Sequence, residues 1–147
     1  NAIETQHIDY VETDSKPTPL NTFLWNSQVE TKTGYRMGYY SLLDSKPIIF
    51  SKEIPKNYEL IEPYKNQKEL QQLIHIADGW YFIEKTDTGF IFNDTRFGQF
   101  GFEENSPFIW RYSMVPVSYN KLKIRRVQPD FEISKGFSSL GERLKGN

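Results

Sequence analysis

Short runs of alternating apolar and polar residues dominate the chain and predict an antiparallel sheet. The alternation is clearest over residues 22–30, 35–43 and 108–117, where it is typical of strands buried on one face. Shorter strands are expected at residues 47–52, 80–85, 90–93 and 121–127. Residues 80–85 carry apolar side chains on both faces, which indicates a central strand.

One amphipathic helix is predicted to begin at Asn66. Asn66 and Glu69 form a pattern like a capping box, and Gly79 suits the residue after the helix end. The apolar stripe of this helix consists of Leu70, Leu73, Ile74 and Ala77. A weaker helix, interrupted by two glycines, is expected from Pro129 to the C-terminus. The sum predicts an α+β fold, in which the central helix packs on an antiparallel sheet of about seven strands.

Turn-forming residues divide these elements. Residues 31–34 and 87–89 are expected to form hairpin loops, with Gly34 at a position of positive φ, and residues 55–63 are expected to be a loop. Residues 1–16 are polar and aperiodic, which predicts an extended arm, and residues 1–2 resemble a tag scar because the chain starts without methionine. We expect residues 17–147 to form a single domain.

Composition narrows the classes of function. The net charge is −1, so no global field recruits nucleic acid, and no nucleic-acid partner is expected. Cysteine is absent, which excludes disulfides and thiolate metal sites. Aromatic residues make up 16% of the chain, a fraction that suits packed sheet faces. No apolar stretch approaches the 18 or so residues of a membrane-spanning helix.

The pattern of ionisable residues predicts neither a metal site nor catalytic residues in this chain. Metal catalysis needs three or more converging His, Asp or Glu ligands, whereas His7 and His75 are far apart and each is expected to be exposed. The sequence contains no HExxH motif, no glycine-rich phosphate loop and no GxSxG nucleophile elbow.

Asp94 and Arg96 are the strongest polar candidates for a binding site. They are expected to flank a turn after an apolar strand, where a carboxylate and a guanidinium can hold a polar ligand. In the structural alternative, which the residues favour, Asp94 caps the turn and Arg96 pairs with it. The same surface is predicted to include Asn21, Tyr39, Ser41 and Arg111.

Two further features allow more than one interpretation. The basic run Lys121, Lys123, Arg125 and Arg126 has a spacing that could follow phosphates or anionic headgroups, but the residues favour a charged, solvated strand that resists edge-to-edge pairing. The aromatic alternation around Trp110 is more typical of a core than of a ligand platform.

Three stretches resemble a known family. They are Pro17-Thr18-Pro19-Leu20-Asn21 followed by Leu24-Trp25, then Gly38-Tyr39-Tyr40-Ser41, and Asn93-Asp94-Thr95-Arg96-Phe97-Gly98. Through these motifs, residues 17–52 and 66–102 resemble the C-terminal soluble part of the inner-membrane family of predicted metal-dependent hydrolases. That family includes the LexA-binding, membrane-associated hydrolase-like proteins.

The resemblance implies an extramembrane accessory domain at the inner membrane. The family's N-terminal part carries several membrane helices with the His and Asp residues presumed to bind a divalent metal. That membrane-embedded part of the same chain is the partner that the resemblance implies, and no cofactor is expected in the present residues. Two alternatives stay open: a stand-alone ligand- or protein-binding module with an aromatic-rich sheet, and an enzyme that uses Asp94 and Arg96.

Overall fold

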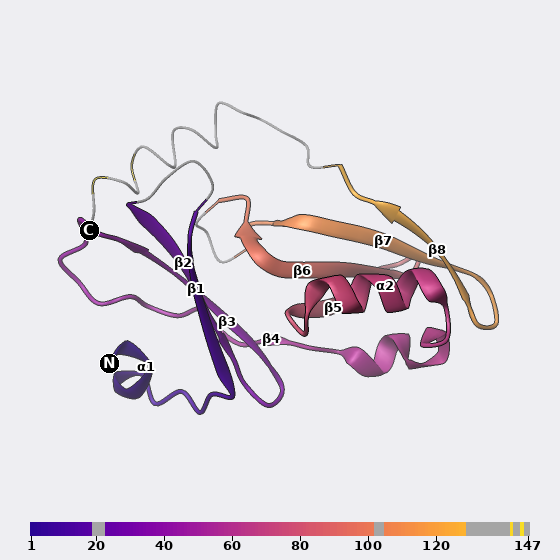
Figure 1. Cartoon of the computed structure of the whole chain (residues 1–147), viewed down its shortest axis with the longest axis horizontal. Helices are drawn as coiled ribbons and strands as arrows, with labels where there is room; N and C mark the ends of the chain where they lie inside the picture. The colour runs from indigo at the N-terminus through magenta and orange to yellow at the C-terminus, as the bar shows by residue number, and fades with distance from the viewer. Residues whose placement is uncertain (19–22, 102–104, 129–141, 143–144, 146–147) are drawn as a thin grey trace. The chain divides into compact units, whose positions relative to one another are not determined.

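The structure, a computed structural model, describes residues 1–18, 23–101, 105–128, 142 and 145. It divides into two compact units (Figure 1). The first unit comprises Asn1–Ile54, Gln99–Pro107 and Phe131–Asn147, and the second comprises Pro55–Gly98 and Phe108–Asp130. The prediction of one domain over residues 17–147 stays a prediction.

The first sheet has four strands in the order β1-β2-β3-β4. The strands are β1 (Glu12–Pro17), β2 (Leu24–Glu30), β3 (Gly34–Ser41) and β4 (Ile54–Pro55). Antiparallel pairing sets Ser15 opposite Ser27 and Ser27 opposite Gly38. The expectation of an extended arm was therefore wrong in part: the arm contains the short helix α1 (Ala2–Thr5), and β1 is a paired edge strand of the sheet.

Residues 47–52 do not form the predicted strand. The side chain of Gln6 pairs with this segment instead, because its Nε2 donates to the Ile48 carbonyl at 2.8 Å and its Oε1 accepts from the Phe50 amide at 3.1 Å. The Ser51 amide donates to the Met37 carbonyl at 2.7 Å. These contacts satisfy the backbone without a regular ladder and bury Phe50.

Gly34 is required for its lack of a side chain rather than for a positive φ. Its φ is not among the positive values in the described chain, which corrects the expectation for this loop. A Cβ on Gly34 would lie 2.3 Å from the Ile54 carbonyl oxygen, so the close approach of β4 excludes any larger residue. Thr31 and Thr33 close the same loop through hydroxyl hydrogen bonds to the Glu53 carboxylate.

The second unit packs helices on one face of a second four-stranded sheet (Figure 1). Its elements are η1 (Tyr58–Tyr64, a 3-10 helix), α2 (Lys68–Ala77), β5 (Tyr81–Lys85), β6 (Phe90–Gln99), β7 (Phe108–Ser118) and β8 (Lys121–Arg126). The strand order is β5-β6-β7-β8. Residues 55–63, predicted to be a loop, thus contain most of η1, whose Ile61 is buried.

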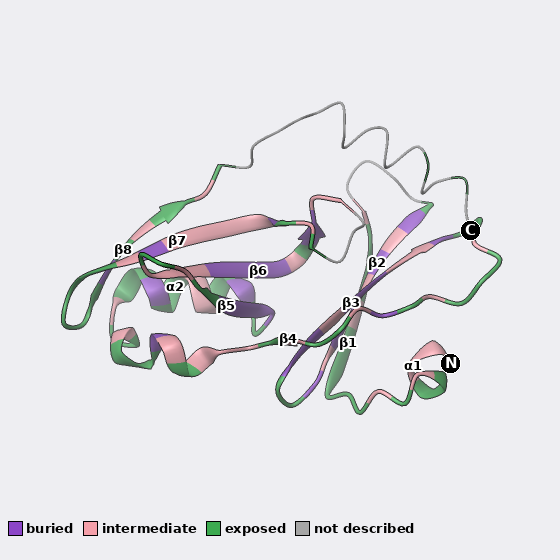
Figure 2. Cartoon of the chain, turned by 180° about the vertical axis from the view of Figure 1, so that it is seen from behind, coloured by how far each residue is buried: buried purple, intermediate pink, exposed green. Residues whose placement is uncertain are grey.

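The core of the second unit lies between α2 and the sheet (Figure 2). Leu70 and Ala77 of α2 are fully buried against Ile83 and Phe92, and the predicted apolar stripe of the helix is confirmed. Tyr81 stacks between two rings, with centroids 4.4 Å from Tyr58 and 4.7 Å from Phe92. Offset stacking of this kind adds to the burial of apolar area.

The start of α2 differs from the prediction. Its N-cap is Gln67, which makes no capping hydrogen bond, because the Gln67 side chain binds β8 instead. Asn66 is therefore not the cap. The C-terminal prediction is confirmed in outline: Asp78 and Gly79 both have positive φ after the last helical residue.

Strand β5 lies at a sheet edge, so its predicted central position was wrong. Residues 56–57 occupy its open side: the Ile83 amide donates to the Lys56 carbonyl, and Asn57 Nδ2 donates to the Ile83 carbonyl, both at 2.9 Å. Apolar residues lie on both faces of this strand because each face is packed. Tyr81 and Ile83 belong to the helix-side core, and Phe82 on the opposite face packs edge-on against Phe108 of β7.

The α+β class and the antiparallel sheet are confirmed, but the strands form two sheets of four rather than one sheet of about seven. One reason is that β1 and β4 join the first sheet from segments without a clear alternation. The predicted C-terminal helix falls almost entirely outside the described residues.

Candidate functional site

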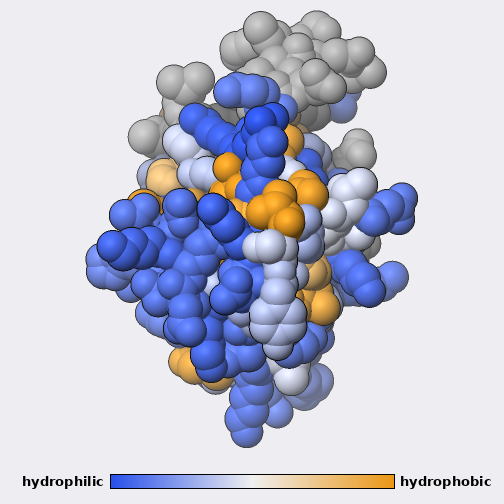
Figure 3. Space-filling view, turned by 90° about the vertical axis from the view of Figure 1, so that its right-hand side faces the viewer, coloured by the Kyte–Doolittle hydropathy of each residue, from blue (hydrophilic) through white to orange (hydrophobic). Residues whose placement is uncertain are grey.

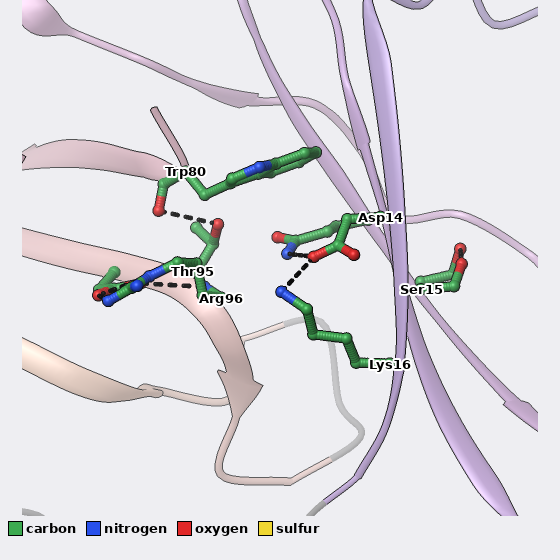
Figure 4. A network of polar contacts seen from close by, with 9 residues as sticks. Asp14, Ser15, Lys16, Trp80, Thr95 and Arg96 are labelled. Atoms are coloured by element: carbon green, nitrogen blue, oxygen red, sulfur yellow. Dashed lines mark hydrogen bonds and ion pairs between the residues drawn. The ribbon is translucent and has the colours of Figure 1, made fainter. Parts of the chain in front are cut away.

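Asp94 and Arg96 lie inside β6, not beside a turn as expected. Residues two apart in a strand point to the same face, and the Arg96 guanidinium folds back onto the carboxylate (Figure 4). Arg96 Nη2 donates to Asp94 Oδ2 at 2.7 Å, and Nε donates to Oδ1 at 3.0 Å. The Arg96 backbone amide also donates to Oδ1, at 3.1 Å.

The charges of Asp94 and Arg96 are engaged with each other. The Asp94 side chain is only 7% exposed, and both of its oxygens accept hydrogen bonds from Arg96. Hydrogen bonding to Asp94 raises the pKa of the Arg96 guanidinium above its ordinary value, so Arg96 stays charged. Between them, Thr95 donates its amide and its hydroxyl to the Trp80 carbonyl. The arrangement holds β6 to the start of β5 and leaves little of the carboxylate for a ligand.

Tyr39 lies in the first unit, on β3. Its hydroxyl accepts from the Gln99 amide at 3.1 Å and donates to Gln99 Oε1 at 3.3 Å. Desolvation raises the pKa of Tyr39 to about 12, against an opposing effect of the Gln99 backbone hydrogen bond. Ser41, two residues on, is fully buried and accepts from the Leu43 amide. Both side chains therefore serve the fold.

Arg111 points to the other face of the second sheet from Asp94. Its neighbour Tyr112 packs with the helix-side core, as does Tyr81, which is opposite Asp94. Arg111 Nη2 lies 3.9 Å from Glu84 Oε2, a loose pair, and its buried Nε has no hydrogen-bond partner among the described residues. Asn21 lies outside the described residues.

Of the six predicted site residues, the three in the second unit do not share one face of its sheet. Asp94 and Arg96 bind each other, and Arg111 lies across the sheet from them. Tyr39 belongs to the first unit, so its grouping with the others stays a prediction.

The described residues include no group of three His, Cys, Asp or Glu side chains placed to hold a metal ion. His7 and His75 are both exposed, as expected. None of the helices in the described part of the chain has the length and apolar character that crossing a bilayer needs.

A row of two neighbouring rings with a cation at each end lies on the second sheet. Arg126 Cζ lies 3.8 Å from the centroid of the Trp110 ring, and the centroids of the Trp110 and Phe97 rings are 5.6 Å apart. At the other end, Arg96 Cζ lies 5.2 Å from the centroid of the Phe97 ring. We call these four residues the cation–aromatic row. Phe97 is 45% exposed and Arg126 is exposed, so these two members of the row can hold planar or anionic groups by stacking and charge, whereas the Arg96 guanidinium is bound to Asp94.

Sequence reasoning missed the row because its members come from three strands. The sequence does place a tryptophan and two adjacent arginines on consecutive strands, which is an unusual combination. Periodicity alone does not give the register that brings their side chains together. The expectation that aromatic residues belong to the core holds for Phe108, which is buried, whereas Trp110 and Tyr112 on the same strand are half-buried.

Comparison of the chain with protein-family models, with curated proteins and with solved structures finds no match.

Proposed function

We propose that this chain is an extramembrane accessory domain of a membrane-bound metal-dependent hydrolase, where it binds a ligand or partner and does not supply the metal site. One observation carries the binding role. The carboxylate of the strongest candidate, Asp94, is bound by Arg96, whereas the exposed side chains Phe97 and Arg126 of the second sheet are aromatic and cationic. Acid–base or metal chemistry needs accessible carboxylates or imidazoles, and stacking surfaces of this kind serve recognition.

The sequence motifs that carry the family resemblance contain residues that are buried in the fold. Asn93 and Thr95 are buried in β6, and a Cβ on Gly38 would lie 2.8 to 3.1 Å from the side chains of Ile48 and Phe50. Residues that a fold requires in this way mark a shared domain rather than a shared reactive centre. This supports the reading of the chain as the family's C-terminal part.

In this proposal the catalytic metal is a divalent ion held by the N-terminal, membrane-embedded part that the resemblance implies. That part is also the proposed partner of the domain. The site of action is then the inner membrane.

The second candidate function is a stand-alone binding module with no hydrolase attached. The exposure of Phe97 beside Trp110 favours a ligand-binding role in either case. Attachment to a membrane separates the two candidates, because only the accessory domain requires it.

A hydrolysis assay tests the non-catalytic role. The purified chain would be incubated with chromogenic ester and phosphate substrates in the presence of Mn²⁺ or Zn²⁺, alongside Asp94→Ala and the control Asp87→Ala, which changes an exposed hairpin-loop residue. We expect all three proteins to match the buffer rate. Turnover by the parent chain that Asp94→Ala abolishes and Asp87→Ala retains would make this domain an enzyme and overturn the proposal.

A further inference from the structure

The β7–β8 hairpin concentrates positive charge in a chain that is nearly neutral overall. Residues 105–128 contain five basic residues and no acidic residue, although the net charge of the whole chain is −1. Four of the five lie on β8, and those four are exposed. Within the described part of the chain, no hydrogen bond or ion pair engages the side chains of Lys123 and Arg125. The hairpin is therefore a local cationic surface.

The register places three of these cations on one face. Lys123 is opposite Val115 and Arg125 is opposite Ser113, whereas Met114 and Ile124 form the adjacent pair that faces the core. Lys121, Lys123 and Arg125 therefore project from the face that α2 does not cover, about 7 Å apart along the strand. This geometry suits contact with a flat array of anionic groups.

The tip of the hairpin exposes apolar and aromatic side chains beside the polar Ser118 and Asn120. Tyr119 is 95% exposed and Val117 is 56% exposed, and Pro116 beside them is also exposed. Figure 3 views the side on which this hairpin lies in Figure 1 and shows small apolar patches within a mostly hydrophilic surface. Tyrosine favours the boundary between hydrocarbon and water, and lysine and arginine favour the headgroups next to it.

The hairpin is held in place before any ligand arrives. Leu122 is buried in the core, and both of its backbone groups bond to the side chain of Gln67. Arg126 is held by stacking on Trp110. A pre-organised surface loses less side-chain and backbone freedom when it binds.

We propose that the β7–β8 hairpin docks on an anionic phospholipid surface, with Tyr119 and Val117 at the headgroup boundary and Lys121, Lys123 and Arg125 on the lipid phosphates. This inference rests on the proposed function, since it names the membrane as the surface that the domain binds. A basic strand could also follow the phosphates of a nucleic acid. The exposed valine and proline at the tip favour a lipid surface, because they match hydrocarbon and not a phosphate backbone.

Vesicle co-sedimentation of the 147-residue chain tests the inference. The vesicles contain phosphatidylcholine alone or phosphatidylcholine with phosphatidylglycerol. The charge variant is Lys121→Gln/Lys123→Gln/Arg125→Gln, and the control Lys32→Gln/Lys46→Gln/Lys85→Gln removes the same charge from other exposed positions. Val117→Ser/Tyr119→Ser tests the tip without changing charge.

We expect binding to the anionic vesicles only. Each near-surface cation contributes roughly fivefold to membrane partition, so the charge variant should bind on the order of 100-fold more weakly, and the control within about threefold of the parent. The tip variant should also bind more weakly. The altered residues are exposed, so circular dichroism should show every variant folded.

Three results would overturn the inference: no binding of the parent chain to anionic vesicles, equal losses in the charge variant and its control, or tighter binding to duplex or single-stranded DNA than to vesicles. The first of these would leave the proposed function standing, because an accessory domain can be anchored by the membrane helices of its partner alone. A full-length protein that is soluble without detergent would remove the proposed function even if the hairpin binds vesicles.

Discussion

The side chain of Gln67 forms a reciprocal pair of hydrogen bonds with the backbone of Leu122. Gln67 Nε2 donates to the Leu122 carbonyl at 2.8 Å, and Gln67 Oε1 accepts from the Leu122 amide at 2.7 Å. The glutamine amide thus occupies the place that a further strand would take beside the edge strand β8. This contact joins the start of α2 to the strand that carries the basic residues, and it explains why Gln67 does not cap its own helix.

Replacement of Gln67 by alanine should destabilise the chain by about 1–3 kcal/mol, because two partly buried backbone groups lose their partners. Urea unfolding followed by circular dichroism measures the change. Gln72→Ala, on the exposed side of the same helix, is the matched control and should shift the free energy of unfolding by less than about 0.5 kcal/mol. Equal midpoints for the two variants would show that the Gln67 contact contributes nothing.

Removal of Arg96 should be among the more harmful side-chain changes in the second unit. Arg96→Ala leaves the nearly buried Asp94 carboxylate without its guanidinium partner, which we expect to cost roughly 3 kcal/mol in the free energy of unfolding. Arg96→Lys should recover only part of this loss, since an ammonium cannot reproduce the two-pronged contact. The control is Arg125→Ala at an exposed position on β8. A loss for Arg96→Ala no larger than that of the control would refute a structural role for the pair.

Two hairpin glycines should be intolerant of any side chain. A Cβ on Gly34 would lie 2.3 Å from the Ile54 carbonyl oxygen, and a Cβ on Gly89 would lie 2.2 Å from the Met114 carbonyl oxygen. Each glycine-to-alanine variant should lose at least about 2 kcal/mol, as expected when a close backbone contact is overpacked. Gly79→Ala, where no atom lies within 4 Å but φ is positive, should lose only about 1 kcal/mol. Thermal unfolding of the three variants measures these losses. If Gly79→Ala were the least stable of the three, the result would contradict this account.

Tyr39 should ionise later than an ordinary tyrosine. Its pKa is raised to about 12 in the folded chain, against about 10 in the unfolded chain. The folded state therefore holds the proton more tightly. The resulting stabilisation is fully present below pH 10 and is lost as the pH rises from 10 towards 12.

Absorbance at 295 nm, recorded against pH, measures this ionisation. The difference between the parent chain and Tyr39→Phe should show one tyrosinate forming near pH 12, with no step near pH 10. The slope of stability against pH between 10 and 12 should be shallower in Tyr39→Phe. A difference spectrum with its midpoint near pH 10 would mean that the Tyr39 hydroxyl is hydrated rather than bound to Gln99.

Local pattern predicted most strands and the central helix, and the Leu70–Ala77 stripe matches the buried face of that helix. Alternation located β2 without identifying its buried side, because the polar Asn26 and Gln28 are buried whereas Trp25 is only half-buried. It did not predict how strands are shared between two sheets, because alternation identifies a strand without identifying its neighbour. The apolar run at residues 48–50 shows the same limit. Gln6, more than 40 residues away, takes its backbone groups, and no local pattern contains that contact.

The candidate site was predictable to a similar degree. The structural alternative predicted that Arg96 pairs with Asp94, and the contacts confirm this pairing, but both residues lie inside β6 and not at the turn that Asp94 was expected to cap. The stacking of Arg126 on Trp110 and of Trp110 near Phe97 depends on strand order and register, which single-chain periodicity leaves open.

Membrane attachment is the most direct test of the proposed role. The full-length native protein would be expressed with a C-terminal tag, and cells would be fractionated with and without detergent. We predict that the protein sediments with the inner membrane and needs detergent for extraction, and that protease treatment of spheroplasts either removes or spares the tag and so assigns the side. A protein recovered in the soluble fraction without detergent would contradict the accessory-domain account and favour a stand-alone binding module.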